Sequence, residues 1–252
     1  MGATARVPAA LVVAGVVLAG GVLGLTGCGT GAGSAAADPV TTTTEPPRHV
    51  PPPVGGALSA AVEPWPDDGG GDAAGAGELL VFGDSVAVLI ADELARSLDQ
   101  RLVVDGIDCR RLDLGFAGPC GGVPAGTSVA PALDDLAPAA SRLAAPDQAA
   151  AVLLLANNAA LAAGDLDAAM AALAPLPRVW WVTTRVEGRA WQDPNNALLT
   201  DLAARDPRAG VVDWFAASDG EGWLADNVHP DDEGQAALAD LVADHVRCDC
   251  TP

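Results

Sequence analysis

The chain has 252 residues, half of them apolar, which is enough for one medium-sized domain with accessory segments. Its formal net charge is -20 and all 13 basic residues are arginines, so the chain lacks the clustered basic surface that phosphate binding requires. This composition excludes a nucleic-acid partner and favours solubility.

The N-terminus carries an export signature. Arg6 precedes an apolar stretch over residues 7–25, which ends in Leu25-Thr26-Gly27-Cys28. The pattern resembles a bacterial lipoprotein signal, which implies that residues 1–27 are removed and that Cys28 carries a lipid on the outer face of the bacterial cell membrane. The alternative is an uncleaved transmembrane anchor, because about 19 apolar residues just span a bilayer. Both interpretations place the rest of the chain outside the cytoplasm.

Residues 28–77 are low in complexity. Ala, Gly and Ser are followed by a threonine run, two proline clusters and a segment rich in Asp and Gly, with no periodic apolar face. Such a segment does not bury enough surface to offset its ordering entropy. We therefore expect a disordered tether that holds the following domain on the order of 40 Å from the membrane.

From Glu78 onward, short apolar runs alternate with helical patterns rich in Ala and Leu. The runs predict strands over 79–82, 102–104, 151–155, 179–183 and 210–213, and the patterns predict helices over 86–98, 129–143, 166–173, 195–204 and 231–246. Continuous apolar strands that are each followed by a helix indicate a parallel sheet covered on both faces. Residues 78–252 are therefore expected to form one three-layer α/β/α sandwich with a parallel sheet of about five strands.

Four cysteines follow Cys28, and an even number in an exported chain predicts disulfides before metal ligands. Cys109 and Cys120 enclose a short loop rich in Gly and Pro, and a bridge there would contribute about 2 to 3 kcal/mol. The pairing of Cys248 and Cys250 stays open, because a bridge between residues two apart makes a small strained ring and pairing with Cys109 and Cys120 is the alternative. A zinc site is the alternative, but these cysteines lack the usual ligand spacing, and no metal is expected.

Polar side chains follow three of the predicted strands. Ser85 comes after the first strand, Asn158 after the third, and the segment from Asp226 to His229 after the fifth. The carboxyl ends of parallel strands meet at one edge of the sheet, where such folds bind their ligands. A serine hydroxyl needs an imidazole to take its proton and a carboxylate to hold that imidazole in one tautomer. The sequence therefore predicts a triad of Ser85, His229 and Asp226.

The order Ser, Asn, Asp-x-x-His in a small α/β domain resembles the SGNH or GDSL hydrolase superfamily over residues 78–247. Gly83-Asp84-Ser85 matches the nucleophile block, and Asp226-Asn227-Val228-His229 matches the Asp-x-x-His block. The resemblance implies a flavodoxin-like SGNH fold. It also implies that Ser85 is the nucleophile, His229 the base and Asp226 its orienting partner.

The same resemblance implies an oxyanion hole made by the backbone N–H of Ser85, the side chain of Asn158 and one further backbone N–H. Two features depart from the family pattern. Ala156 stands where the family has glycine, and the glycine of the family's second block is not evident. We therefore expect Cys109 or its neighbours to supply the last N–H, in a loop shaped by the bridge to Cys120.

Further details favour one branch of the superfamily. The segments Val179-Trp180-Trp181-Val182-Thr183-Thr184-Arg185 and Val212-Asp213-Trp214 look like the extracellular SGNH domains of the acyltransferase group that includes peptidoglycan O-acetyltransferases. The tryptophans after residue 178 are expected to pack in the core or at the rim. Arg185 and Arg189 either bind an anionic or glycan substrate or form structural ion pairs, and the many carboxylates favour the ion pairs.

Together these observations predict an extracellular serine esterase or O-acyltransferase. Its substrates would be O-acyl esters, above all acetyl esters, of a small molecule or a cell-wall glycan, and it would act without a cofactor and as a monomer through an acyl-serine intermediate. The alternative is a catalytically inactive lipoprotein that keeps the SGNH fold and binds envelope glycan. The alanine at position 156 and the unclear second block motivate that alternative.

Overall fold

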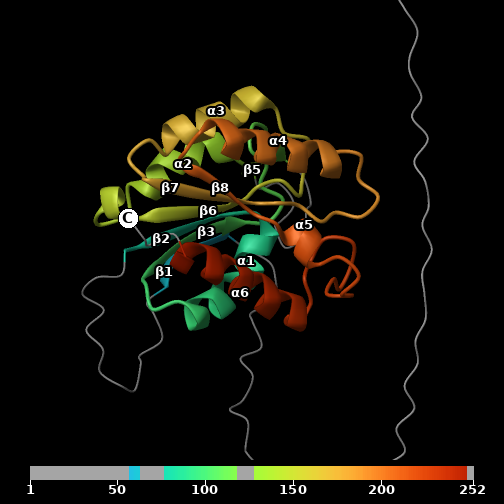
Figure 1. Ribbon diagram of the computed structural model, residues 1–252. Coiled ribbons are helices and arrows are strands. Elements are labelled where there is room, and N and C mark those ends of the chain that lie inside the picture. The colour runs from blue at the N-terminus through green and yellow to red at the C-terminus, as the bar shows by residue number, and fades with distance from the viewer. Residues whose placement is uncertain (1–56, 63–76, 118–127, 249–252) are drawn as a thin grey trace, which may run out of the picture. The chain divides into compact units, whose positions relative to one another are not determined.

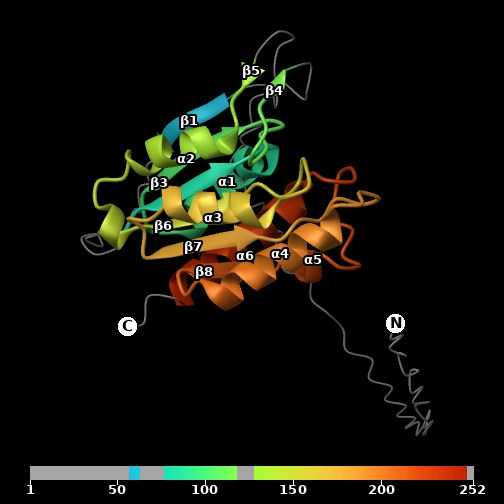
Figure 2. The ribbon, with the colours of Figure 1, turned by 90° about the horizontal axis from the view of Figure 1, so that it is seen from above.

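The computed structural model describes residues 57–62, 77–117 and 128–248. A six-stranded sheet lies between two layers of helices (Figures 1 and 2). In spatial order its strands are β1 (Ala57–Val62), β3 (Leu102–Ile107), β2 (Leu79–Gly83), β6 (Ala150–Leu154), β7 (Arg178–Val182) and β8 (Ala209–Val212). Five strands are parallel and β1 is antiparallel to β3. The predicted parallel sheet is confirmed.

The strand order positions the site. The chain begins the parallel sheet at β2, adds β3 on one side, and then crosses to the other side of β2 to add β6, β7 and β8. The reversal falls between β2 and β6, and sheets of this kind bind ligands at the carboxyl ends of the strands that flank such a switch point. Ser85 follows β2, and Asn157 and Asn158 follow β6, so all three residues lie at that point.

Helices cover both faces of the sheet (Figure 1). One layer contains α1 (Ser85–Ser97), α5 (Trp214–Ala217) and α6 (Asp232–Cys248), and the other contains α2 (Ala132–Ala140), α3 (Ala163–Ala172) and α4 (Gln192–Arg205). Alternate residues of β2 serve the two layers: Leu80 and Phe82 pack beneath α2 and α3, whereas Leu79 and Val81 pack against α1 and α6. This is why the central strands are continuous apolar runs. A short helix η1 (Pro146–Gln148) and a hairpin of β4 (Phe116–Ala117) and β5 (Ser128–Val129) complete the described elements.

Strand β1 corrects the prediction for residues 28–77. Residues 57–62 were expected to belong to a structureless tether, but they pair with β3 from Ala57 opposite Ile107 to Val62 opposite Leu102. An uncovered β3 would leave a row of backbone N–H and C=O groups at the sheet edge, and this pairing satisfies them. The prediction of disorder is therefore wrong for this segment.

The expected signal peptide over residues 1–27 and its lipid-bearing Cys28 lie outside the described residues. Within the described ranges, no helix is long and apolar enough to cross a membrane.

Candidate active site

Ser85 stands where strand β2 turns into helix α1. β2 ends at Gly83, which lies so close to β6 that an added Cβ would meet the carbonyl oxygen of Leu154 at 2.5 Å. Asp84 caps the helix: its carboxylate accepts the backbone N–H of Val86 at 3.0 Å, and its own N–H donates to the carbonyl of Leu154 at 3.0 Å. These contacts hold Ser85 as the first residue of α1, where it is 7% exposed.

Three side chains meet at this edge of the sheet. The Oγ of Ser85 lies 2.9 Å from Nε2 of His229, and Nδ1 of His229 lies 2.8 Å from an oxygen of Asp226. A carboxylate beside Nδ1 favours the tautomer with its proton on Nδ1, which leaves the lone pair of Nε2 directed at the serine hydroxyl. The structure thus brings together the nucleophile and the base expected from the sequence, 144 residues apart, with the expected carboxylate behind them.

The loop before α6 holds the imidazole in place. One oxygen of Asp226 accepts the backbone N–H groups of Val228 and His229, both at 2.7 Å, while its other oxygen binds the imidazole. A β-bridge between Leu224 and Pro230 closes the base of the loop. Asp226 therefore shapes the turn that presents His229 as well as orienting its ring.

Asp226 remains ionised at neutral pH. Partial burial raises the pKa of its carboxyl, but the hydrogen bonds from the ring of His229 and from the backbone N–H groups of His229 and Val228 outweigh that effect, and the pKa lies below its ordinary value. The side chain can therefore stabilise the positive imidazolium that forms when His229 takes a proton.

The fully buried carboxylate of Asp84 accepts hydrogen bonds from both asparagines that follow β6. Nδ2 of Asn157 lies 3.2 and 3.0 Å from the two oxygens of Asp84, and Nδ2 of Asn158 lies 3.0 Å from one of them. Burial raises the pKa of Asp84 from 3.8 to about 6, against the lowering effect of its hydrogen bonds from Val86 and Asn157 and of the charge of His229. At neutral pH Asp84 is thus an acceptor that orients both amides.

The raised pKa of Asp84 predicts a pH-dependent difference in stability. The folded state binds the proton of Asp84 more tightly than the unfolded state does. The contribution of Asp84 to the free energy of unfolding is therefore fully present below pH 3.8 and is lost as pH rises through about 6. Asp84→Asn removes this titration. We expect the free energy of unfolding of the wild type, relative to that of Asp84→Asn, to fall by about 2 kcal/mol between pH 4 and pH 7 in urea denaturation. A difference that stays constant over this range would contradict the prediction.

Asn158, the expected side-chain donor of the oxyanion hole, has two acceptors in this structure. Besides Asp84, its Nδ2 donates to the backbone carbonyl of Arg110 at 3.3 Å, the longer of the two bonds. Ala156, the departure from the family pattern, packs in the core, and its carbonyl accepts a hydrogen bond of 2.9 Å from Nδ2 of the buried Asn195. The turn after β6 therefore accommodates the alanine.

Comparison with known proteins identifies the architecture. No family model and no curated protein matches the sequence. Among solved structures, the chain is similar to a lipolytic G-D-S-L family protein from Veillonella parvula, with 16% identity, a TM-score of 0.52, and 66% of this chain and 96% of that chain covered. The chain has the SGNH hydrolase fold. The predicted α/β/α architecture and the predicted SGNH fold are thereby confirmed.

Two further solved structures resemble the chain at TM-scores below 0.5. The C-terminal catalytic domain of peptidoglycan O-acetyltransferase A from Streptococcus pneumoniae is 18% identical at a TM-score of 0.48, covering 68% of this chain and 90% of that chain. An acetylxylan esterase from Geobacillus stearothermophilus is 14% identical at a TM-score of 0.46, covering 68% and 94%.

The end of β3 and the start of the loop that follows it lie beside α1, the helix that begins with Ser85. An added Cβ on Gly106 would meet the side chain of Val88 in α1 at 2.6 Å. Further along the loop, Cys109 has a φ of 61°, in the left-handed region that side chains other than glycine rarely adopt, and the N–H of Arg110 donates to the carbonyl of Ile107 at 3.1 Å. The role of the Cys109 N–H as an oxyanion donor stays a prediction.

The other cysteine predictions each involve at least one residue that the structure does not describe. Cys120 and Cys250 lie outside the described ranges, and Cys248 ends α6, so the Cys109–Cys120 bridge and the pairing at the C-terminus stay predictions. Among the described residues there is no cluster of three or more His, Cys, Asp or Glu side chains that would hold a metal ion.

The rim beside Ser85, Asp226 and His229 is built from aromatic and ionic contacts. Arg185 forms an ion pair of 3.1 Å with Asp219 and lies 5.2 Å from the ring centre of Phe215, which confirms the preferred structural role. Trp214 is buried and stacks on Trp223, with ring centres 5.8 Å apart. The aromatic pair supports the loop that carries the histidine.

Trp191 lies at the rim of the site beside Asn157. Its indole N–H donates to the carbonyl of Asn157 at 3.2 Å, and the guanidinium of Arg189 lies 5.5 Å from the centre of its ring. Trp181 is buried in the core, and Trp180 packs edge-on against His245. These tryptophans pack in the core or at the rim, as expected.

Two hollows adjoin the site. A cavity of about 10 Å³ lies beneath the start of α1, and its walls include Val86, Asn157 and Val228. A groove of about 430 Å³ opens beside Asp226, and neither Ser85 nor His229 is among its lining residues. Its lining is mostly polar and consists of Arg185, Glu187, Ser218, Gly220, Gly222, Trp223, Leu224, Ala225, Asp226 and Asn227.

Arg110 is the part of the site that sequence reasoning missed. The side chain is 1% exposed, and its backbone carbonyl accepts the amide of Asn158. One signal was available: Asp105 interrupts the apolar strand that begins at Leu102, and a carboxylate in a buried strand requires a cationic or hydrogen-bonding partner.

Proposed function

We propose that this chain is an SGNH-type serine esterase or O-acyltransferase that acts on short O-acyl esters, above all acetyl esters. One observation carries the proposal: the Oγ of Ser85 lies 2.9 Å from Nε2 of His229, whose Nδ1 lies 2.8 Å from Asp226. These distances match those needed to activate a serine by an oriented imidazole.

The residues perform two transfers. Ser85 Oγ attacks the acyl carbon while its proton moves to Nε2 of His229, and the carbonyl oxygen of the ester becomes an oxyanion. The tetrahedral intermediate collapses, the bond to the alcohol oxygen breaks, and that oxygen takes the proton from His229. Water or a sugar hydroxyl then gives its proton to His229 and attacks the acyl carbon. The bond from that carbon to Ser85 Oγ breaks, and Oγ takes the proton back from His229.

The size of the cavity beneath α1 supports a short acyl group. A volume of about 10 Å³ holds about one water molecule, so a long acyl chain would find no buried channel there. The acetyl group, with one methyl beyond its carbonyl, needs no such channel.

The groove beside Asp226 supports a substrate that extends beyond the ester. Its polar lining suits the hydroxyl-rich surface of a carbohydrate, and Trp223 supplies an aromatic edge. We therefore favour an acetylated or acetyl-accepting cell-envelope glycan over a free small molecule as the substrate.

The proposed setting is the outer face of the bacterial cell membrane. The lipoprotein-like signal with Cys28, followed by the low-complexity segment, supports export and lipid anchoring. The acidic chain without lysine supports a partner other than nucleic acid, and we propose that the protein acts as a monomer.

A second candidate is a glycan-binding protein without turnover. The observation that favours it is the state of Asn158, whose amide has acceptors in both Asp84 and the carbonyl of Arg110, so that neither N–H is uncommitted before substrate binds. Catalysis would require the longer of these bonds to open.

The test of the proposed function uses the purified full-length protein. It is incubated with O-acetylated wall fragments, and in parallel with non-acetylated fragments plus aryl acetate as the acetyl donor, and the acetyl group is followed by mass spectrometry. Acetate release from the first mixture supports an esterase, and acetylated fragments in the second support a transferase. Glycan binding with no turnover of either ester and no labelling by a serine-reactive phosphonate would favour the second candidate.

A further inference from the structure

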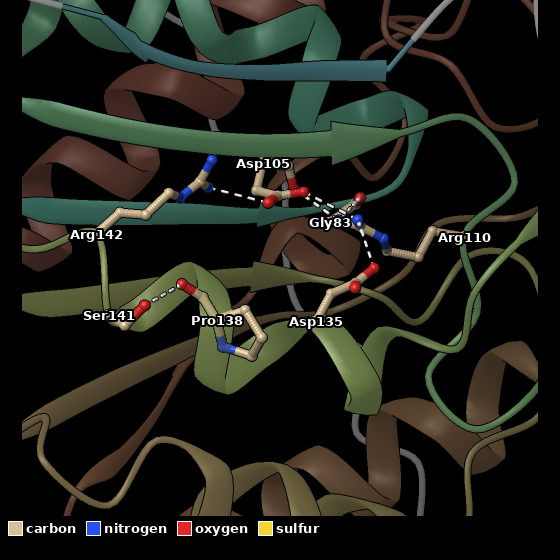
Figure 3. A network of polar contacts seen from close by, with 7 residues as sticks. All are labelled: Gly83, Asp105, Arg110, Asp135, Pro138, Ser141 and Arg142. Atoms are coloured by element: carbon tan, nitrogen blue, oxygen red, sulfur yellow. Dashed lines mark hydrogen bonds and ion pairs between the residues drawn. The ribbon is translucent and has the colours of Figure 1, made fainter.

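Arg110 is a buried cation whose two terminal guanidinium nitrogens are both paired (Figure 3). Its guanidinium contacts Asp105 through both the carboxylate and the carbonyl oxygen, each at 2.9 Å, and Asp135 at 3.2 Å. It also lies 4.3 Å from the ring centre of Phe82. A buried charge is costly unless it is paired and hydrogen-bonded, and these contacts meet that condition.

The partners of Arg110 belong to the elements that converge on the serine. The same guanidinium donates to the carbonyl of Gly83 at 3.4 Å, and Gly83 is the last residue of β2, two positions before Ser85. Asp105 lies in β3, and Asp135 lies in α2 on the helical layer above. A planar group with several fixed donors can tie three elements together, whereas a lysine ammonium is a single point charge.

The backbone of Arg110 reaches the other expected oxyanion donors. Its carbonyl accepts the amide of Asn158 at 3.3 Å, and its N–H closes the turn onto Ile107. The preceding residue, Cys109, adopts the left-handed conformation, which costs on the order of 1 kcal/mol or more and persists only where the surroundings hold it. The ion pairs of the Arg110 side chain fix the residue that follows Cys109 and so help to keep Cys109 in this conformation.

We propose that Arg110 is a positioning residue that sets the geometry of the oxyanion hole. Its side chain holds the end of β2, just before Ser85, and its backbone carbonyl binds the amide of Asn158. Because Arg110 directly follows Cys109, its anchored position also fixes the turn at Cys109. Asp105 and Asp135 offset its charge, so it acts through geometry and not through a field at the reacting carbonyl. The assignment rests on the proposed esterase or transferase function.

Arg142 provides a matched control. Its guanidinium binds the other oxygen of the Asp105 carboxylate at 2.9 Å, but it is 34% exposed and follows α2 at the opposite end from the site (Figure 3). Arg142→Gln therefore removes an ion pair from the same carboxylate while the contacts of Arg110 to Gly83 and Asp135 remain.

The test compares Arg110→Gln, Arg110→Lys and Arg142→Gln in aryl acetate hydrolysis and in binding of methylboronic acid. Boronic acid adds to Ser85 Oγ, with the serine proton passing to His229, and gives a tetrahedral anionic adduct that occupies the oxyanion hole. We expect Arg110→Gln to lower kcat by about 10- to 100-fold with KM unchanged, and to weaken the boronate by the same factor. Arg110→Lys should restore little, and Arg142→Gln should stay within about twofold of the wild type.

Thermal melting separates positioning from folding. If Arg110→Gln does not fold, Asp135→Asn, which removes one partner of the guanidinium at a half-exposed carboxylate, should still lower kcat and boronate affinity together by about threefold. If the Arg110 and Asp135 variants fold and match an active wild type in kcat and boronate affinity, the positioning role of Arg110 is overturned while the proposed function stands. A wild type with neither turnover nor a boronate adduct overturns the proposed function and the assignment with it.

Discussion

Ser85→Ala and His229→Ala are each expected to lower the kcat of aryl acetate hydrolysis by about 10⁴- to 10⁶-fold. Ser85→Ala removes the atom that forms the acyl-enzyme, and His229→Ala removes the base 2.9 Å from that atom. Because the two side chains act in one step, the double variant should lose little more than either single variant. The measurements are initial rates and labelling of Ser85 by a serine-reactive phosphonate.

Two substitutions serve as controls for the loss of a serine or a histidine. Ser97→Ala changes a serine at the exposed end of the same helix, where it binds Asp240 at 2.9 Å, and His245→Ala changes a histidine that packs against Trp180. Both controls should retain activity within about threefold, since neither touches the reacting atoms. Undiminished hydrolysis in both Ser85→Ala and His229→Ala would refute the mechanism.

Asp226→Asn is expected to lower kcat by about 10³-fold while KM changes little. The carboxylate accepts the Nδ1 proton of His229 at 2.8 Å, and an asparagine that presents its NH₂ there would favour the tautomer with the proton on Nε2. That tautomer cannot accept the proton of Ser85. The low pKa of Asp226 means that the wild-type carboxylate keeps this role at mildly acidic pH.

Asp226→Ala distinguishes tautomer control from loop support. Alanine removes the acceptor for the N–H groups of Val228 and His229 as well as for the ring, but it imposes no tautomer. If the tautomer dominates, the asparagine variant should be at least as slow as the alanine variant. Equal rates for Asp226→Asn and the wild type would show that the carboxylate is dispensable. Asp244→Asn, which disrupts an exposed ion pair with Arg247, is the control for the charge change.

Much of the fold follows from local pattern. The five apolar runs became β2, β3, β6, β7 and β8 because a strand covered by helices on both faces is apolar at most of its positions, and that pattern is visible in one segment at a time. The helix after β2 was predictable for a related reason, since Asp84 offers a capping oxygen just before an amphipathic stretch.

Strand β1, by contrast, could not be predicted from local sequence pattern. Residues 57–62 are rich in alanine and stand between segments rich in Pro and Gly, so their composition alone favours disorder. Their structure comes from pairing with β3, about 45 residues later in the chain, and an edge pairing leaves no strong local signature. Tertiary context therefore overrides propensity here.

The order of the chemical groups is readable from the sequence alone. A serine, an asparagine and an Asp-x-x-His segment each follow a strand of one parallel sheet, which places Ser85, Asn158 and His229 at one edge. The way in which these groups are held follows from three-dimensional packing. Asp84 orients both asparagines, and Arg110 ties β2, β3 and α2 together behind the serine. A buried charge takes its partners from whichever elements packing brings close, and local spacing in the sequence does not encode that proximity.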